Sequence, residues 1–204
     1  MNYKILIYIL ISYFIGAVPV SFIFCKLIKG VDIRKIGSRN VGATNAARVL
    51  GKKYFFIITF LDALKGFIPV FLFKKLFFLD FNKFFVLVII SVILGHTYSI
   101  YLKFKGGKGV ATSAGVFLAV DYRVVLIGLI LFLFTLIITK YVSAASIVAA
   151  ISLPLSYFIL YKKNLNIYFF SLTIFIAFYI IFKHRENIKR IIKKEEYKWG
   201  TKIN

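Results

Sequence analysis

The sequence predicts an all-α fold: a polytopic bundle of about seven transmembrane helices, formed by one domain that covers residues 1–204. Hydrophobic residues make up 61% of the 204 residues, whereas a typical soluble domain has about 45–50%. The runs 124–139 and 168–182 contain no charged residue. A soluble protein could not cover so much apolar surface, and no linker or low-complexity stretch divides the chain.

Seven apolar segments are candidates for membrane crossings, since a spanning helix needs about 20 mostly apolar residues, or about 17 at the short end. The fourth segment is too short to cross unaided, so we expect five to seven crossings and favour seven. The segments are residues 3–27, 55–73, 84–102, 110–120, 124–139, 142–161 and 168–182.

The distribution of lysine and arginine predicts the orientation. With seven crossings, 20 of these residues fall on one side of the membrane and 7 on the other. The basic side holds the loops 26–53 and 103–108, Lys140 and the tail 183–204. Because cytoplasmic loops carry an excess of lysine and arginine, the N-terminus is predicted outside and the C-terminus in the cytoplasm.

The net charge of +21 lies beside the membrane segments rather than on a soluble face. Such charges attract anionic lipids or anionic substrates, and we favour both over nucleic acid. The single cysteine, Cys25, rules out an intramolecular disulfide. With only two histidines in the chain, the sequence predicts no metal site.

A glycine-rich loop between two apolar segments is the most informative motif. Residues 105–109 are Lys105, Gly106, Gly107, Lys108 and Gly109. Glycine lets a ligand approach the backbone closely, and successive free N–H groups with a lysine form an anion site. A flexible loop that only needs positive charge is the alternative, but it would not need three glycines. The sequence therefore favours a phosphate site here.

The first basic loop carries a second polar motif, because residues 37–48 read GSRNVGATNAAR. The hydroxyl groups of Ser38 and Thr44 and the amides of Asn40 and Asn45 suit phosphate oxygens. Arg48 can bind a phosphate with two parallel N–H bonds. An ordinary turn with a helix cap is the alternative, although one such residue would be enough for a cap.

Further polar residues stand out in apolar surroundings. His96, late in the third segment, indicates either a function or a structural bond to a neighbouring helix, and both remain open. His184 and Asn187 share a helix face at the same mouth as the two loops. A solvated basic tail explains their neighbours but not these two. Asp62 and Lys65 are expected to pair as structural support, and catalysis is the less favoured alternative.

Together these motifs resemble the bacterial integral-membrane glycerol-3-phosphate acyltransferases that use acyl-phosphate as donor. The resemblance covers essentially the whole chain. It rests on GSRNVGATNAAR at 37–48, LGH at 94–96 with FKGGKGVAT at 104–112, and HRENIKR at 184–190 leading to Glu196; DALKG at 62–66 and YVS at 141–143 also match. The departures are Arg39 and Lys194, where the family usually has glycine, and Tyr197, where it usually has proline.

The resemblance implies the reaction of acyl-phosphate with glycerol-3-phosphate to give 1-acyl-glycerol-3-phosphate (lysophosphatidate) and phosphate. It implies no cofactor, membrane lipid as surroundings, an acyl-phosphate-forming enzyme that hands over the donor, and a place in the bacterial cytoplasmic membrane with the site facing the cytoplasm. The residues carried over are Ser38, Arg48, His96 and Lys108 as catalytic, and Asn40, Thr44, Asn45, Lys105, Gly106, Gly107, Gly109, Thr112, Ser143, His184 and Asn187 as substrate-binding.

Two questions stay open at this level. The general base is His96, His184 or a substrate phosphate, since a typical histidine pKa near 6.5 suits either imidazole. An organic-anion transporter would use the same basic vestibule. Against the transporter, the polar motifs gather on one side, whereas a transporter needs a midplane site open to both faces. A structural membrane subunit would explain the hydrophobicity but not the motifs.

The charge distribution yields a topological prediction. Cysteines introduced at Lys52 and at Lys198 should react in intact cells only with membrane-permeant labels, because residues 28–53 and 184–204 are predicted to be cytoplasmic. The measurement is labelling by permeant and impermeant thiol reagents. Labelling of either cysteine from outside by the impermeant reagent would overturn the orientation.

Overall fold

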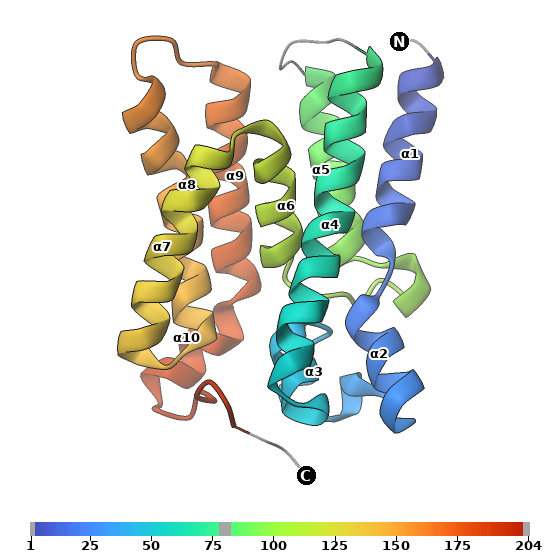
Figure 1. The fold of residues 1–204 in the computed structure, drawn as a ribbon, viewed down its shortest axis with the longest axis vertical. Coiled ribbons are helices and arrows are strands. Elements are labelled where there is room, and N and C mark those ends of the chain that lie inside the picture. Colours follow the sequence, from blue (N-terminus) through green and yellow to red (C-terminus); the bar gives the residue numbers. More distant parts are fainter. Residues whose placement is uncertain (1–2, 78–82, 202–204) are drawn as a thin grey trace.

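The computed structural model describes residues 3–77 and 83–201, which form helices with no strand among them (Figure 1). The α-helices are α1 (Tyr3–Ala17), α2 (Val20–Lys29), α3 (Ala43–Leu50), α4 (Lys52–Phe77), α5 (Lys83–Thr97), α6 (Val110–Val120), α7 (Tyr122–Thr139), α8 (Val142–Tyr161), α9 (Ile167–Lys183) and α10 (Arg185–Ile192), with short 3-10 turns η1 (Ile33–Lys35) and η2 (Ile100–Leu102). The predicted all-helical membrane bundle is confirmed.

Among the described residues, five helical stretches are long and apolar enough to cross a membrane, and α9 with α10 is a sixth if that pair, bent by 55°, is one span. The remaining segment, α6, has only 11 residues, as the sequence predicts. The two ends of the chain lie at opposite ends of the bundle (Figure 1). This placement is what an odd number of passes requires.

The predicted first segment, 3–27, is not one continuous helix. It breaks between α1 and α2 at Val18 and Pro19, because proline lacks an N–H and disfavours helical geometry in the residue before it. The break frees carbonyl groups inside the bundle. Ser99 Oγ donates to Ala17 O at 2.6 Å and Lys65 Nζ donates to Val18 O at 2.7 Å. A cation is favourable at the C-terminal end of a helix such as α1.

The predicted third segment, 84–102, is also interrupted, since α5 ends at Thr97 and η2 follows. Lys103 and Phe104 then adopt left-handed φ values of 53° and 60°, which turn the chain back toward the bundle. Phe104 N–H donates to Ser99 O at 2.8 Å. This compact turn delivers the glycine-rich loop to the interior.

Close backbone approach joins the central helices. On α4 a Cβ built on Gly66 would lie 2.2 Å from Thr112 O, and on α6 a Cβ on Gly115 would lie 1.8 Å from Ala63 O. No side chain fits in either gap. Small residues of this kind let membrane helices pack closely, and van der Waals contact then drives their association.

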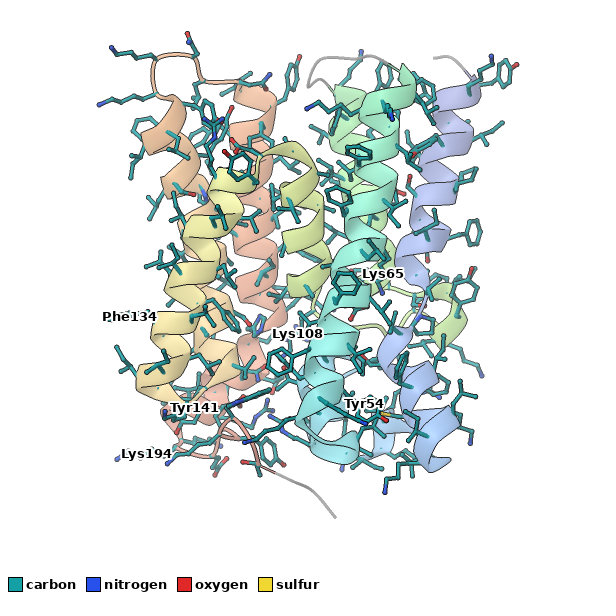
Figure 2. All side chains as sticks on the ribbon, viewed as in Figure 1. Tyr54, Lys65, Lys108, Phe134, Tyr141 and Lys194 are labelled. Carbon is teal, nitrogen blue, oxygen red and sulfur yellow. The ribbon has the colours of Figure 1, made fainter. Side chains whose placement is uncertain are left out.

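The outer face of α7 is strongly apolar and open. Ile130, Phe134 and Ile137 are 65%, 63% and 66% exposed, and Phe134 points away from the bundle (Figure 2). Contiguous apolar surface of this kind is costly in water. In a membrane these side chains meet lipid instead, so the exposed hydrophobic residues agree with the predicted bilayer location.

A polar contact fastens the turn between α6 and α7 to the end of α8. Asp121 accepts from Arg123 N–H at 2.9 Å and from the hydroxyl of Tyr161. The guanidinium of Arg123 lies 5.0 Å from the centre of the Tyr161 ring. The Tyr161 hydroxyl, the Arg123 backbone and the Arg123 guanidinium hold the pKa of the Asp121 carboxyl below its ordinary value, against an opposing effect of burial.

The glycine packing gives a stability prediction with a matched control. Gly115→Ala places a Cβ against the Ala63 carbonyl, so α4 and α6 must separate, at a cost of about 1–3 kcal/mol or more. Gly128→Ala on α7 is the control, because its Cβ would meet only the Ser152 hydroxyl at 3.3 Å and Ala149 O at 3.7 Å. Thermal unfolding in detergent should show a lower Tm for Gly115→Ala, whereas the Tm of Gly128→Ala should stay close to that of the unaltered protein. Equal Tm values would contradict the close approach.

Candidate functional site

Asn45 organises the first basic loop from within. Its Oδ1 accepts from Ser38 N–H at 3.1 Å, and its Nδ2 donates to Ile33 O, Ile36 O and Asn40 O at 3.3, 3.0 and 3.1 Å. Asn45 is 2% exposed, and the main chain uses its hydrogen-bonding groups. The loop conformation therefore depends on Asn45, and its predicted substrate contact stays a prediction.

The other polar side chains of this loop remain available. Ser38, Asn40 and Thr44 are half-buried, and in the described part of the chain none of their side chains has a hydrogen-bond partner. Arg39 is exposed and adopts a left-handed φ of 57°. Arg39 thus takes the backbone conformation that favours glycine and directs its charge outward.

The glycine-rich loop lies directly against the end of α5. Gly106 N–H donates to Thr97 O at 3.2 Å and Gly107 N–H donates to His96 O at 3.1 Å. A Cβ on Gly107 would lie 2.3 Å from His96 Nε2 and 2.5 Å from Val41 O. The phosphate contact expected of these two amides stays a prediction, and the structure shows another use for both. Both are satisfied by α5, and both glycines are needed for this close contact.

The remaining amides of the motif are placed differently. Gly109 has a φ of 84° and caps α6, and the first amide that bonds back within α6 is Ser113 N–H, to Gly109 O at 2.7 Å. The earlier N–H groups of a helix have no intrahelical partner and carry a partial positive charge. An anion site in this loop would thus involve Lys108 and the start of α6, whereas Lys105 is exposed.

Five polar residues from four parts of the chain, Glu196 among them, form one hydrogen-bonded group, which we call the Glu196 cluster. Glu196 Oε1 accepts from Ser143 Oγ at 3.0 Å and from Asn187 Nδ2 at 2.7 Å. Its Oε2 accepts from Arg190 Nε at 2.7 Å. Lys108 Nζ donates to the side-chain oxygen Oδ1 of Asn187. The predicted site residues Lys108, Ser143 and Asn187 are thus brought together.

The charge of this region is unbalanced. Arg48 and Arg190 lie close enough to affect the ionisation of Lys108, and the carboxylate of Glu196 opposes their effect. Burial, which disfavours the charged ammonium, is the main cause that lowers the pKa of Lys108 to about 8. Glu196 opposes this shift, while Arg190, Arg48 and Lys183 contribute to it. Three cations around one carboxylate leave an excess of positive charge that suits an anionic ligand.

Arg48 is the least satisfied of these cations. It is 8% exposed, and its guanidinium has no hydrogen bond or ion pair within the described residues. It lies 4.5 Å from the centre of the Tyr197 ring. A cavity of about 20 Å³ reaches Arg48 between α3 and the tail, and Thr44, Lys52 and Trp199 also line it.

His184 stands beside the Glu196 cluster at the joint of α9 and α10 and is 2% exposed. Its Nδ1 lies 2.8 Å from Ile180 O. Because a carbonyl oxygen only accepts, Nδ1 carries the proton, and Nε2 of the neutral ring is left with a lone pair. Lys108 and Glu196 lie close enough to this imidazole to act on it electrostatically.

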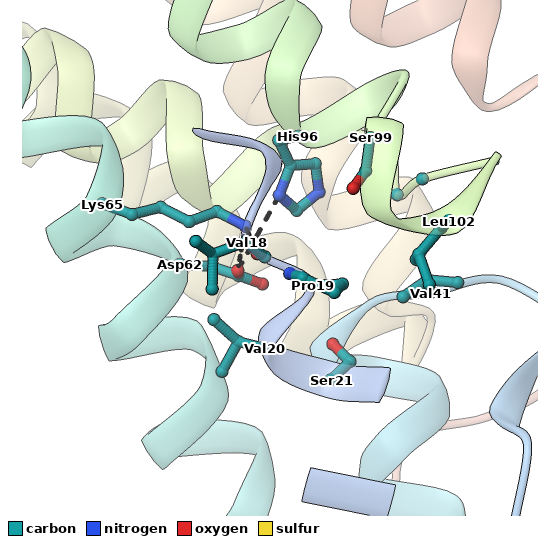
Figure 3. A pocket seen from close by; sticks show the side chains of 12 residues that line it. Val18, Pro19, Val20, Ser21, Val41, Asp62, Lys65, His96, Ser99 and Leu102 are labelled. Atoms are coloured by element: carbon teal, nitrogen blue, oxygen red, sulfur yellow. Dashed lines mark hydrogen bonds and ion pairs between the residues drawn. The ribbon is translucent and has the colours of Figure 1, made fainter. Parts of the chain in front are cut away.

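His96 and Thr112 belong to a different polar group. His96 Nδ1 lies 3.0 Å from Thr112 Oγ1 and 3.8 Å from Asp62 Oδ1, and Asp62 pairs with Lys65 at 2.8 Å. These charges border a cavity of about 10 Å³ at the break between α1 and α2 (Figure 3), which has room for about one water. No hydrogen bond or ion pair in the described residues links His96 to the Glu196 cluster.

Two features of the site escape sequence reasoning. Glu196 follows the motif at 184–190, but the sequence does not indicate a site residue there, because an acidic residue in a basic tail is usually exposed surface charge. Tyr197 and Trp199 give no signal as site residues either. The fold places both residues at the site, since the backbone N–H of Trp199 donates to Lys140 O at 2.7 Å and the centre of its ring lies 4.5 Å from that of Phe55.

Comparison with known proteins agrees with this geometry. The sequence model of a family described as "Glycerol-3-phosphate acyltransferase" matches residues 6–194. A protein of that name from Fusobacterium nucleatum is 45% identical over 192 residues, covering 94% of this chain and 96% of the relative. Another, from Staphylococcus haemolyticus, is 46% identical over 201 residues, covering 95% and 97%.

Two solved structures are similar over nearly the full length. Both are described as PlsY (YgiH), an integral membrane glycerol 3-phosphate acyltransferase, and both are 40% identical to this chain over 97% of it and 96% of the solved chain. The glycerol 3-phosphate form superposes with a TM-score of 0.90. The lysophosphatidic acid form has a TM-score of 0.87.

The lowered pKa of Lys108 gives a pH prediction. Lys108 is charged below about pH 8 and loses its proton as the pH rises through that value. If its charge holds a phosphate, the KM for the phosphate substrate should rise above about pH 8. In Lys108→Arg that rise should disappear, because arginine stays charged. Steady-state kinetics from pH 6.5 to 9.5 measure this, and the same alkaline rise in both proteins would rule out Lys108 as its source.

Proposed function

Because this chain belongs to the glycerol-3-phosphate acyltransferase family, we propose that it transfers an acyl group from acyl-phosphate to the 1-hydroxyl of glycerol-3-phosphate. The products are 1-acyl-glycerol-3-phosphate and inorganic phosphate, an early step of phospholipid synthesis. The transporter alternative loses its support, since the relatives and the solved structures are all described as acyltransferases.

The charge of the site is the observation that carries the proposal. Among the described residues, Arg190, Arg48 and Lys183 act on Lys108, and Glu196 is the carboxylate that opposes them, so positive charge is in excess. A phosphate monoester carries about −1.5 to −2 charges at pH 7. The guanidinium of Arg48 is buried without a polar partner among the described residues, and five N–H donors in a fork suit phosphate oxygens.

The chemistry requires positioning and charge stabilisation rather than a covalent enzyme intermediate. The hydroxyl oxygen of glycerol-3-phosphate attacks the acyl carbon and forms the ester bond. The bond between that carbon and the phosphate oxygen breaks, and phosphate leaves with the electron pair. Holding both reactants in place can supply about 7–11 kcal/mol of the barrier. Arg48 and Lys108 hold the phosphate of glycerol-3-phosphate, which places its hydroxyl next to the acyl carbon.

The hydroxyl proton needs an acceptor, and His184 is better suited than His96. The bond from His184 Nδ1 to Ile180 O fixes the tautomer, so Nε2 can accept a proton next to the Glu196 cluster. His96 instead bonds Thr112 and is covered by Gly107. We therefore assign His184 or a substrate phosphate as the base. His96 and Thr112 hold α5 against α6 under the glycine-rich loop.

The first loop contributes further donors. Ser38, Asn40 and Thr44 are available at its surface, with Asn45 fixing the backbone behind them. The acyl tail of the donor lies among the apolar helices, while its phosphate meets the basic end of the bundle. We place this end in the cytoplasm of a bacterial cell, where an acyl-phosphate-forming enzyme supplies the donor.

A pair of arginine substitutions tests the proposal. Arg48→Lys loses the bidentate geometry and should lower kcat/KM by about 100-fold or more. Arg39→Gly removes an exposed side chain from a left-handed position, so activity should be equal or better and the protein slightly more stable. The measurement is formation of lysophosphatidate and phosphate by purified protein in detergent, at equal folded amounts.

The same assay separates the donor from the acyltransferase activity itself. Acyl-phosphate should give one phosphate for each lysophosphatidate, and acyl-CoA should give no product. Product formed from acyl-CoA alone would refute the proposed donor while leaving the family assignment intact. Near-normal turnover by Arg48→Lys, together with loss of turnover by Arg39→Gly, would show that the phosphate contact lies elsewhere in the loop.

A further inference from the structure

The contact between Arg48 and Tyr197 raises a question about how a buried cation is held. Arg48 belongs to α3 and is 8% exposed, yet the described residues give its guanidinium no hydrogen bond and no ion pair. The contact that it makes is with the face of the Tyr197 ring, 4.5 Å from the ring centre. Tyr197 lies beyond residues 6–194, which the family model matches.

An aromatic face holds a guanidinium differently from a carboxylate. The negative face of the ring attracts the cation and fixes its plane. The N–H groups lie in the plane of the guanidinium and point outward from its edge, so the ring consumes none of them. A carboxylate would take two of the five donors. Tyr197 can therefore immobilise Arg48 while leaving its donors free for a phosphate.

The tail holds Tyr197 from both sides. Immediately before it, Glu196 accepts hydrogen bonds from Ser143, Asn187 and Arg190. Two residues after it, Trp199 N–H bonds Lys140 O at 2.7 Å and the indole packs on Phe55 at 4.5 Å. Residues 196–199 are thus tied down at both ends. Tyr197 has little freedom to follow Arg48, so the ring sets the position of the guanidinium.

We propose that Tyr197 is a positioning residue for the reaction: its ring holds Arg48 so that the guanidinium edge faces the substrate phosphate. The inference rests on the proposed function, since it assigns a role to Arg48 in phosphate binding. The hydroxyl of Tyr197 has no hydrogen-bond partner among the described residues, so the ring and not the hydroxyl does the positioning. The tail beyond the family match then completes the site.

The test compares Tyr197→Phe with Tyr197→Leu. Phenylalanine keeps the ring and should retain kcat/KM within about two-fold of the unaltered protein. Leucine removes the ring face, and kcat/KM for glycerol-3-phosphate should fall by about ten-fold, as expected for the loss of a desolvated cation–π contact. Equal activity of the leucine and unaltered proteins overturns the proposal, and so does an equal loss in both variants.

A control comes from a second contact between an arginine and a tyrosine ring among the described residues. Tyr161 stacks with Arg123 at 5.0 Å toward the opposite end of the bundle. Tyr161→Leu should lower Tm but leave kcat/KM per folded protein unchanged. If Tyr161→Leu lowers kcat/KM as much as Tyr197→Leu does, the loss reflects general destabilisation and the positioning role is refuted.

A second series tests the ring if Tyr197→Leu does not fold. Phenylalanine at 197 with increasing numbers of ring fluorines keeps the shape but weakens the negative face, so kcat/KM should fall stepwise with fluorination. A flat series overturns the proposal. Stabilisation of the purified protein by glycerol-3-phosphate in thermal unfolding should follow the same order. Activity of the unaltered protein separates the two claims: if it makes no lysophosphatidate, the proposed function fails first.

Discussion

The carboxylate of Glu196 is the interaction on which the architecture of the basic end depends. It joins α8 through Ser143 and α10 through Asn187 and Arg190. Through Asn187 it also reaches Lys108 of the glycine-rich loop. Glu196 itself is 8% exposed. A buried carboxylate must be paired and hydrogen-bonded to persist, and here three side chains donate to it.

The same carboxylate makes a concentration of positive charge tolerable. Without it, Arg48, Lys108 and Arg190 would repel one another at the edge of a low-dielectric region. With it, part of the repulsion is offset, and the remaining charge is available to substrate. Burial is the main cause of the lowered pKa of Lys108, but Arg190, Arg48 and Lys183 also lower it against the effect of Glu196, so the compensation is incomplete. Under the proposed function this excess of charge serves to bind a phosphate, because a fully neutral site would have little reason to bind one.

Backbone contacts supply the rest of the positioning. Gly106 and Gly107 let the loop lie on the end of α5, and Gly66 and Gly115 let α4 approach α6. These glycines fix where α6 begins and therefore where Lys108 stands. The buried Asp62–Lys65 pair and His96 lie beneath this loop (Figure 3) and stabilise the break between α1 and α2 through the Val18 carbonyl. The group of Asp62, Lys65 and His96 thus supports the glycine-rich loop, but it shares no described hydrogen bond with the Glu196 cluster.

Hydropathy and charge were sufficient to predict the helical membrane bundle and the short α6. The motifs also identified Lys108, Ser143 and Asn187, which the fold brings together. Local patterns could not show that the amides of Gly106 and Gly107 are used by α5, because that depends on a contact between separate segments. For the same reason, they could not show that the side chain of Asn45 bonds the backbone of its own loop. Tyr197 was beyond prediction, since only the folded tail brings its ring to Arg48.

The most direct test of the central claim is a structure of this protein with glycerol-3-phosphate bound, in lipid nanodiscs or in crystals. We expect phosphate oxygens at about 2.7–2.9 Å from the guanidinium of Arg48 and the ammonium of Lys108, with the Tyr197 ring still behind Arg48. A phosphate held at Lys105, or among the amides of Gly106 and Gly107, with Arg48 still lacking a polar partner, would contradict the central claim.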